Sequence, residues 1–393
     1  MLDSKSNATG HDSLRALIAR FDPVVIDVPK QRARIRLEVE GDSAWDAMIR
    51  GERVELMPAD ERLAPDALLR ADGATWRRIA DDVRGGMDAF RRGRLTVRHN
   101  LHLGVGFLAA TSGMTDPGRL RFESIRTPKA TLSVLTAGQG EPVICLHGLG
   151  ATKASFLPTV AALADEYRVI AADLPGFGES DKPIAAPYNA RYFAGAVLAL
   201  MDALGIESAH LVGNSMGGRI AIETGLRAPE RAKRVVLLSP AMAWLRDRPL
   251  RWLLQLPLPR LGLIQPTPRW AAEPILRRLV PGGEDGWAAA GVDEFLRSYL
   301  TPRGRAAFYE AARNIYLDEP YGENGFWTRL NGLSCDTMFV WGRRDSLVPI
   351  GFMKHVEREL PAARHVELDC GHVPQLERPR ETHAAIRDFL SKA

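Results

Sequence analysis

The chain has 393 residues, of which 46% are hydrophobic and 25% charged, so it is long enough for two globular domains with sizeable cores. Its formal net charge is only +4, and no block of Lys and Arg alternates with aromatic residues, so we expect no nucleic-acid partner. Three cysteines without a CxxC pair predict neither a disulfide framework nor a thiolate metal site. Because no signal-like start and no run of about 18 apolar residues occur, we expect a cytoplasmic protein.

The first part of the chain predicts a small α+β domain. Residues 1–31 are interpreted as an N-terminal segment, in which residues 1–10 are expected to be disordered and residues 13–21 to form a short helix. Alternating or helical apolar patterns predict strands over 34–40, 53–57, 66–71 and 94–98, and helices over 74–83 and 101–111. In the first strand, Ile35, Leu37 and Val39 are expected to point inward. The turn sequence Thr115-Asp116-Pro117-Gly118 then marks a boundary between domains 32–118 and 119–393.

Residues 32–112 resemble the SCP-2 sterol-carrier-like family. The resemblance rests on Asp66–Trp76, Gly86–Phe90, Gly93–Val97 and the apolar helix after Asn100. It implies a hydrophobic tunnel for lipids or acyl chains, and the alternative is a scaffold or dimerisation module without ligand. Arg98-His99-Asn100 departs from the family pattern, in which a glycine and an acidic residue are expected. We expect His99 and His102 to be surface residues rather than metal ligands.

From residue 120 onward, strands and helices alternate. Strands are expected over 120–126, 132–137, 143–146, 169–172, 210–212, 235–238, 337–341 and 365–368, and helices over 159–167, 192–204 and 216–226. This order predicts an α/β fold with a doubly wound, mostly parallel sheet, whose site lies at the carboxyl ends of its strands.

Ser215 lies at a predicted strand-to-helix turn, with Gly213 and Gly217 two residues away on either side. Such a turn exposes the serine hydroxyl, and only glycine leaves room for the neighbouring backbone. The amide of Met216 begins the following helix and points at any negative charge beside the hydroxyl. The pattern therefore predicts a serine nucleophile.

A serine nucleophile needs a base and an orienting acid, and two later loops supply them. Asp345 follows one predicted strand and His372 the next, in the chain order Ser, Asp, His. The loop His147-Gly148-Leu149-Gly150 is expected to offer the amide of Leu149 as a second oxyanion donor. A dinucleotide-binding loop fits less well because Lys153 stands where a third glycine is needed, so we expect no cofactor. We also expect no metal ion.

Residues 119–393 resemble the α/β-hydrolase fold superfamily. The shared motifs are His147-Gly148, Asp173–Asp181, Gly213–Gly217, Gly342–Asp345 and Gly371-His372. By that resemblance, Asp173 and Asp181 shape loops. His147, within the predicted oxyanion loop, is expected to shape that loop rather than to act in catalysis. Residues 240–334 lose the strand pattern and are predicted to form a helical cap rich in apolar residues, with helices over 273–279 and 303–316. We expect Trp244 and Val373 to contact substrate, although the cap aromatics could equally pack on one another; a peripheral membrane contact also stays open.

These residues predict a serine hydrolase that cleaves a carboxylic ester of a hydrophobic, acyl or lipid-like substrate. One alternative resembles the carbon–carbon bond hydrolases of meta-cleavage type, which often share the form Gly-Asn-Ser-Met-Gly-Gly. Those enzymes generally carry a Gly-Pro-Gly-like run after the oxyanion glycine and a tryptophan after the catalytic histidine, whereas this chain has Gly150–Lys153 and Val373. The other alternative is a non-catalytic lipid-binding protein on a hydrolase scaffold. The sequence does not predict the oligomeric state.

Overall fold

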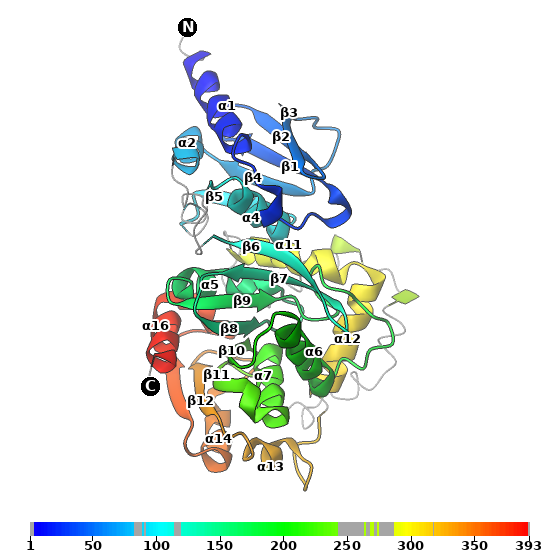
Figure 1. Cartoon of the computed structure of the whole chain (residues 1–393), viewed down its shortest axis with the longest axis vertical. Coiled ribbons are helices and arrows are strands. Elements are labelled where there is room, and N and C mark those ends of the chain that lie inside the picture. The colour runs from blue at the N-terminus through cyan, green and yellow to red at the C-terminus, as the bar shows by residue number, and fades with distance from the viewer. Residues whose placement is uncertain are drawn as a thin grey trace. The chain divides into compact units, whose positions relative to one another are not determined.

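The structure is a computed structural model, and it groups the chain into two compact units (Figure 1). It describes residues 4–81, 89, 92–113, 119–242, 263–264, 268–270, 273–274, 287–316 and 318–391. The first unit combines Met1–Glu123 with Leu276–Arg297, and the second combines Ser124–Ile275 with Ser298–Ala393. Leu276–Arg297 lies within residues 240–334, which the sequence pattern predicted to form a cap on the second unit. None of the described helices has both the length and the apolarity needed to cross a membrane.

The first unit is built on a mixed five-stranded sheet in the order β3-β2-β1-β4-β5. Strand β1 pairs antiparallel with β2 and parallel with β4. The strands are β1 (Arg32–Val39), β2 (Ala44–Arg50), β3 (Arg53–Pro58), β4 (Ala67–Ala71) and β5 (Leu95–Arg98). The helices are α1 (Ser4–Ile18), α2 (Gly73–Asp81) and α4 (Leu101–Ala110). Ile35, Leu37 and Val39 are buried, as their alternation predicted. Whether this unit binds a lipid stays a prediction.

Three local expectations in this unit were wrong. Helix α1 begins at Ser4, so residues 4–10 are helical rather than disordered. Strand β2 was missed because Asp46, near its middle, is buried and breaks the apolar pattern. Asp46 accepts hydrogen bonds from Arg36 Nε at 2.8 Å and Arg34 Nη1 at 2.6 Å. His102 is also buried, and its Nε2 lies 2.5 Å from the carbonyl oxygen of Asp27.

The second unit contains an eight-stranded sheet in the order β13-β12-β11-β10-β8-β9-β7-β6. The strands from β9 to β13 across this sheet are parallel, and β7 joins β9 antiparallel. Its strands are β6 (Arg121–Arg126), β7 (Thr131–Ala137), β8 (Glu141–Leu146), β9 (Tyr167–Ala172), β10 (Ala209–Asn214), β11 (Ala232–Leu238), β12 (Asp336–Gly342) and β13 (Arg364–Leu368). The mostly parallel sheet predicted from the alternating pattern is therefore present.

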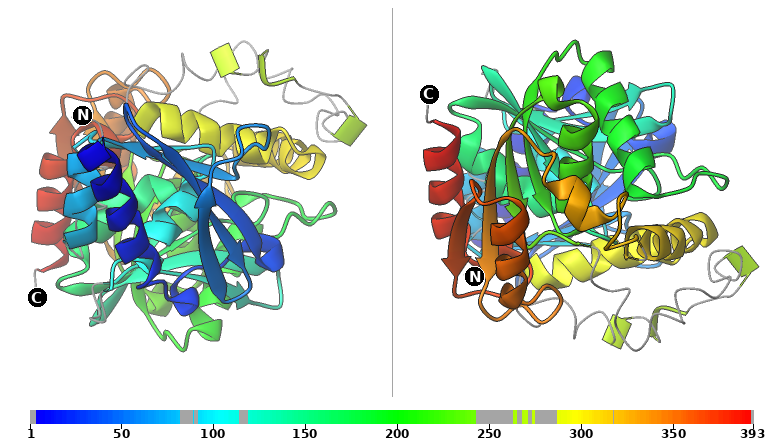
Figure 2. Two further views of the ribbon diagram at one scale, coloured as in Figure 1. Left: turned by 90° about the horizontal axis from the view of Figure 1, so that it is seen from above. Right: turned by 90° about the horizontal axis from the view of Figure 1, so that it is seen from below.

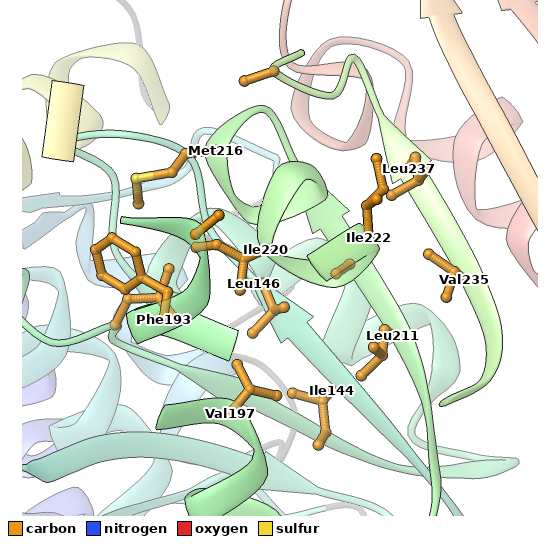
Figure 3. Close-up of a cluster of buried hydrophobic side chains, with 14 of the residues drawn as sticks. Ile144, Leu146, Phe193, Val197, Leu211, Met216, Ile220, Ile222, Val235 and Leu237 are labelled. Carbon is orange, nitrogen blue, oxygen red and sulfur yellow. The ribbon is translucent and has the colours of Figure 1, made fainter. Parts of the chain in front are cut away.

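Helices cover both faces of this sheet (Figures 1 and 2). Helices α5 (Leu157–Leu163) and α16 (Pro379–Leu390) lie on one face, and α6 (Ala190–Ala203) and α7 (Met216–Arg227) on the other. Figure 3 shows how the core forms beneath α6 and α7, where Phe193 and Val197 meet Ile144, Leu146 and Leu211 of the strands. Met216 and Ile220 of α7 join the same cluster, so the helix that begins beside Ser215 is fixed by buried apolar contacts.

The described part of the predicted cap is helical. It contains α11 (Trp287–Tyr299), α12 (Pro302–Tyr316) and α13 (Phe326–Leu330). Helix α12 matches the expected helix at 303–316, whereas most of the helix expected over 273–279 lies outside the described residues. Trp244 also lies outside them, so its expected substrate contact stays a prediction.

Candidate active site

Ser215 occupies the bend between β10 and α7. Its backbone has φ 51° and ψ −113°, a conformation that residues with a side chain rarely adopt. The surrounding backbone holds this bend, because the amide of Ser215 donates to the carbonyl of Leu238 at 3.0 Å and its carbonyl accepts from Ala241 at 2.8 Å. Ser215 is therefore held in a strained backbone conformation, as in a nucleophile elbow, where such a turn exposes the serine hydroxyl.

The two flanking glycines are required by close backbone contacts. A Cβ on Gly217 would lie 1.9 Å from the carbonyl oxygen of Leu146. A Cβ on Gly213 would lie 2.4 Å from the carbonyl oxygen of Gly217. Both distances are far below van der Waals contact, which confirms the expectation that only glycine fits at these positions.

Asp345 and His372 lie together at the ends of neighbouring strands β12 and β13. His372 Nδ1 is 2.8 Å from Asp345 Oδ2. The other carboxylate oxygen of Asp345 accepts the amides of Leu347 at 2.8 Å and Val348 at 2.9 Å. Burial alone would raise the pKa of Asp345, but the hydrogen bonds from His372 and these amides outweigh it and leave the pKa lowered. The carboxylate is thus charged and turned toward the imidazole.

The loop that carries His372 is tied to the residue before Ser215. The side-chain amide of Asn214 donates to the carbonyl of His372 at 3.1 Å and to that of Leu238 at 3.0 Å. Because β10 lies two strands away from β12 in the parallel part of the sheet, the serine bend and the Asp345–His372 pair lie at the same carboxyl edge.

The predicted oxyanion loop also lies against Ser215. A Cβ on Gly148 would be 3.4 Å from the Cβ of Ser215. His147 shapes this loop: its Nε2 accepts the amide of Leu174 at 3.0 Å, so its Nδ1 donates to the carbonyl of Gly148 at 2.8 Å. Burial lowers the pKa of His147, which keeps it neutral for both bonds. Leu149 follows directly in the loop, and Met216 is the first residue of α7, so both expected oxyanion donors belong to segments that border Ser215.

A buried ion pair joins Lys153, shortly after the oxyanion loop in the chain, to Asp173. Lys153 Nζ lies 2.6 Å from Asp173 Oδ2, and the amide of Lys153 donates to Asp173 Oδ1 at 2.7 Å. Burial acts to raise the pKa of Asp173, but the charge of Lys153 holds it well below its usual value. Asp181 accepts the amide of Thr131 at 2.7 Å. Both aspartates therefore shape loops, as the resemblance implied. Within the described ranges, no group of three or more His, Cys, Asp or Glu side chains is arranged to hold a metal ion.

Comparison with known proteins identifies the family. The family model for the α/β-hydrolase fold matches residues 141–379, more than half of the chain. The chain belongs to the α/β-hydrolase fold family. The match begins after the first unit's sheet and spans most of the second unit, together with the segment Leu276–Arg297 that groups with the first unit.

Two bacterial relatives of this α/β hydrolase carry the name 2-hydroxy-6-oxo-6-phenylhexa-2,4-dienoate hydrolase. The one from Burkholderia cepacia is 35% identical over 273 residues, which are 65% of this chain and 89% of the relative. The one from Comamonas testosteroni is 32% identical over 275 residues, with the same two shares.

Two solved structures resemble this α/β hydrolase with 26% sequence identity. A bacterial membrane phospholipase A superposes with a TM-score of 0.57, covering 69% of this chain and 86% of that one. An esterase from Thermogutta terrifontis superposes with a TM-score of 0.55, covering 69% and 98%.

Two residues that contact the main chain around His372 in this hydrolase were not predicted from the sequence. Asn214 was noticed only as part of a family motif, and Glu377 was not singled out. The Glu377 carboxylate accepts the amides of Gly371 at 2.7 Å and Val373 at 3.0 Å. Its position five residues after His372 is the only signal that the sequence offered. Val373, expected to contact substrate, is half-buried directly after the histidine.

Proposed function

We propose that this α/β hydrolase uses Ser215, His372 and Asp345 to cleave a carbon–carbon bond in a 2-hydroxy-6-oxo-dienoate. The serine bend beside an Asp345–His372 pair at 2.8 Å supports the nucleophile. The 35% and 32% identity to hydrolases named for such a dienoate supports the substrate class over the ester that the sequence first favoured.

In this proposal, the substrate first ketonises: the proton of the 2-hydroxyl group moves to C5, which becomes a methylene between the C6 carbonyl and the enone formed by C2, C3 and C4. The Ser215 hydroxyl attacks the C6 carbonyl while His372 Nε2 takes its proton and Asp345 steadies the imidazole. The amides of Leu149 and Met216 bind the developing oxyanion. The C5–C6 bond then breaks, its electron pair leaves as the conjugated dienolate, and His372 returns the proton to that oxygen. Water, activated by His372, hydrolyses the remaining acyl-serine to the carboxylic acid and free Ser215.

Ester hydrolysis is the second candidate. The run Gly150-Ala151-Thr152-Lys153 and Val373 stand where the carbon–carbon hydrolases generally have a Gly-Pro-Gly-like run and a tryptophan. The resemblance to an esterase and a phospholipase A at 26% identity favours the same candidate. An ester needs no ketonisation, since His372 simply protonates the leaving alcohol after the same attack by Ser215.

We propose a separate role for the first unit. Its resemblance to lipid-carrier domains supports a role in binding a hydrophobic substrate, which would raise the substrate's local concentration near the second unit. A co-purifying lipid or apolar acid, extracted from the full-length protein and identified by mass spectrometry, tests this role. An extract without any such compound, from protein also unable to bind a fluorescent fatty acid, would contradict it.

The substrate class is tested by comparing the kinetics of the two reactions, each measured separately. The full-length protein is assayed with 2-hydroxy-6-oxo-6-phenylhexa-2,4-dienoate and with p-nitrophenyl esters of increasing chain length. We expect kcat/KM for the dienoate to exceed that for the best ester by at least about 10-fold, and a reversed ratio selects the ester candidate. Ser215→Ala should abolish both activities, and Ser334→Ala, at an exposed serine, should change neither. No turnover together with no labelling of Ser215 by a fluorophosphonate would reject the serine mechanism.

A further inference from the structure

The segment around His372 has no regular structure, yet its main chain is held on both sides. It connects β13 to the short helix α15 (Pro374–Glu377). The Glu377 carboxylate uses one oxygen for the amide of Gly371 and the other for the amide of Val373, at 2.7 and 3.0 Å. These two amides flank His372 in the chain, so one carboxylate brackets the histidine.

The carbonyl between these amides is held by a different element. Asn214, at the end of β10, donates to the carbonyl oxygen of His372 at 3.1 Å. Asn214 is buried, and both hydrogens of its amide group are used, because it also donates to Leu238 at 3.0 Å. Three main-chain groups, one from each of Gly371, His372 and Val373, are thus fixed by two side chains, in addition to the bond between the His372 ring and Asp345.

We propose that Glu377 is a positioning residue for His372, and that Asn214 completes the same arrangement from the serine side. The inference rests on the proposed function, in which His372 must reach the Ser215 hydroxyl. Hydrogen bonds to a charged carboxylate are the stronger kind, so this bracket resists displacement of the loop. A misplacement of a reacting group by about 1 Å can lower a rate by roughly 100-fold.

A purely structural role for Glu377 makes a different prediction. A carboxylate that only supports the start of α15 would affect the free energy of unfolding, and the activity of the folded fraction would stay unchanged. A positioning role lowers kcat in the folded protein far more than it changes KM, because the hydrogen bonds of Glu377 hold the main chain that carries His372. The two roles are therefore separable by kinetics on folded protein.

The test compares Glu377→Gln and Glu377→Ala with Glu381→Gln in the full-length protein. Gln keeps one acceptor oxygen and Ala keeps none, whereas Glu381 lies on α16 with its side chain 52% exposed. We expect kcat and the rate of Ser215 labelling by a fluorophosphonate to fall about 10-fold for Gln and about 100-fold for Ala, with KM within 2-fold. Glu381→Gln should match the parent. Parental kcat in folded Glu377→Ala, confirmed by its melting curve, would overturn the proposal.

A spectroscopic readout keeps this test independent of the proposed activity. The proton between His372 Nδ1 and Asp345 should give a strongly downfield ¹H resonance, assigned by its absence in His372→Ala. We expect this resonance to broaden or shift in Glu377→Ala and to stay unchanged in Glu381→Gln. If the parent protein is neither active nor labelled, the proposed function fails. The resonance still decides the positioning role, because an unchanged signal in Glu377→Ala contradicts it.

Discussion

At the scale of single residues, the two carboxylate oxygens of Asp345 make different contacts at the same time. Its Oδ1 accepts two backbone amides and its Oδ2 accepts the ring of His372. An asparagine at this position would keep its oxygen toward the two amides and turn its NH₂ group toward the ring. Nδ1 would then have to accept a hydrogen bond, which places the proton on Nε2 and leaves no base for Ser215.

We therefore predict that Asp345→Asn lowers kcat by roughly 10⁴-fold with the fold intact. The lost charge-assisted bond should also lower the free energy of unfolding at pH 7 by about 1–3 kcal/mol. Since the pKa of Asp345 is lowered in the folded state, its stabilisation is present above the unfolded pKa of about 4 and is lost as pH falls through the folded pKa. The stability difference between the parent and the variant should thus shrink below about pH 4.

Urea unfolding between pH 3 and pH 8, together with steady-state kinetics, checks this prediction. Asp336→Asn is the matched control, because the Asp336 side chain is 74% exposed and lies 3.5 Å from Arg234. It should leave kcat unchanged. A stability difference for Asp345→Asn that persists undiminished at pH 3 would show that the carboxylate charge is not what stabilises this loop.

The sequence was sufficient to predict Asp345 and His372 because their positions follow from strand order. Each comes directly after a strand, and parallel strands end at a common edge. The roles of Asn214 and Glu377 could not be predicted in the same way. Their partners are main-chain atoms of Gly371, His372 and Val373, which leave no signature in the residue types. The family model fixes the fold, and the chemistry at Ser215 stays a proposal.

At the scale of elements, the contact between α7 and β8 decides whether the serine bend forms. Gly217 lies so close to β8 that a Cβ would meet the carbonyl oxygens of Leu146 at 1.9 Å and of His147 at 2.8 Å. These are backbone atoms of the last residue of buried strand β8 and of the residue after it, and they cannot move aside as the end of a flexible side chain can. A methyl group must therefore push α7 away from the sheet.

We predict that Gly217→Ala lowers the free energy of unfolding by more than about 2 kcal/mol and removes activity. Gly351→Ala is the control, since nothing lies within 4 Å of its Cβ position. That substitution should change stability by less than about 0.5 kcal/mol. Urea denaturation of both variants, read by tryptophan fluorescence, measures the difference. Equal stability for the two variants would mean that α7 and β8 are not in tight contact in solution.

Elements with clean periodicity were predictable, and those that bury charge were not. Strand β1 followed from the alternation of Ile35, Leu37 and Val39. Its neighbour β2 was missed because the buried Asp46 is stabilised by Arg34 and Arg36, and only the paired strand supplies those partners. A buried charge reads as a surface residue until its counter-ion is known.

At the scale of the whole molecule, the first compact unit includes a segment that lies far along the chain, Leu276–Arg297. Asp293 and Glu294 of α11 are buried. Asp293 accepts the Arg98 guanidinium at 2.6 Å and the amide of His99 at 3.1 Å, while Glu294 accepts the amide of Leu101 at 3.2 Å. A carboxylate at the first amide of α4 is also favoured by the helix dipole. No local pattern predicts this, because the partners lie almost 200 residues apart in the sequence.

We expect α11 to open together with α4 and β5, and separately from β10 and α7. Native-state hydrogen exchange on the full-length protein measures this, since residues of one cooperative unit share one opening free energy. Arg98→Ala removes the Arg98 guanidinium from the buried Asp293, so it should lower the opening free energy of α11 and α4 by about 1–3 kcal/mol. Amides of β10 should keep their protection, and Arg53→Ala, at an exposed arginine, should alter none of them. If α11 instead exchanges with β10 in the parent and is unaffected by Arg98→Ala, its carboxylates do not bind it to the first unit.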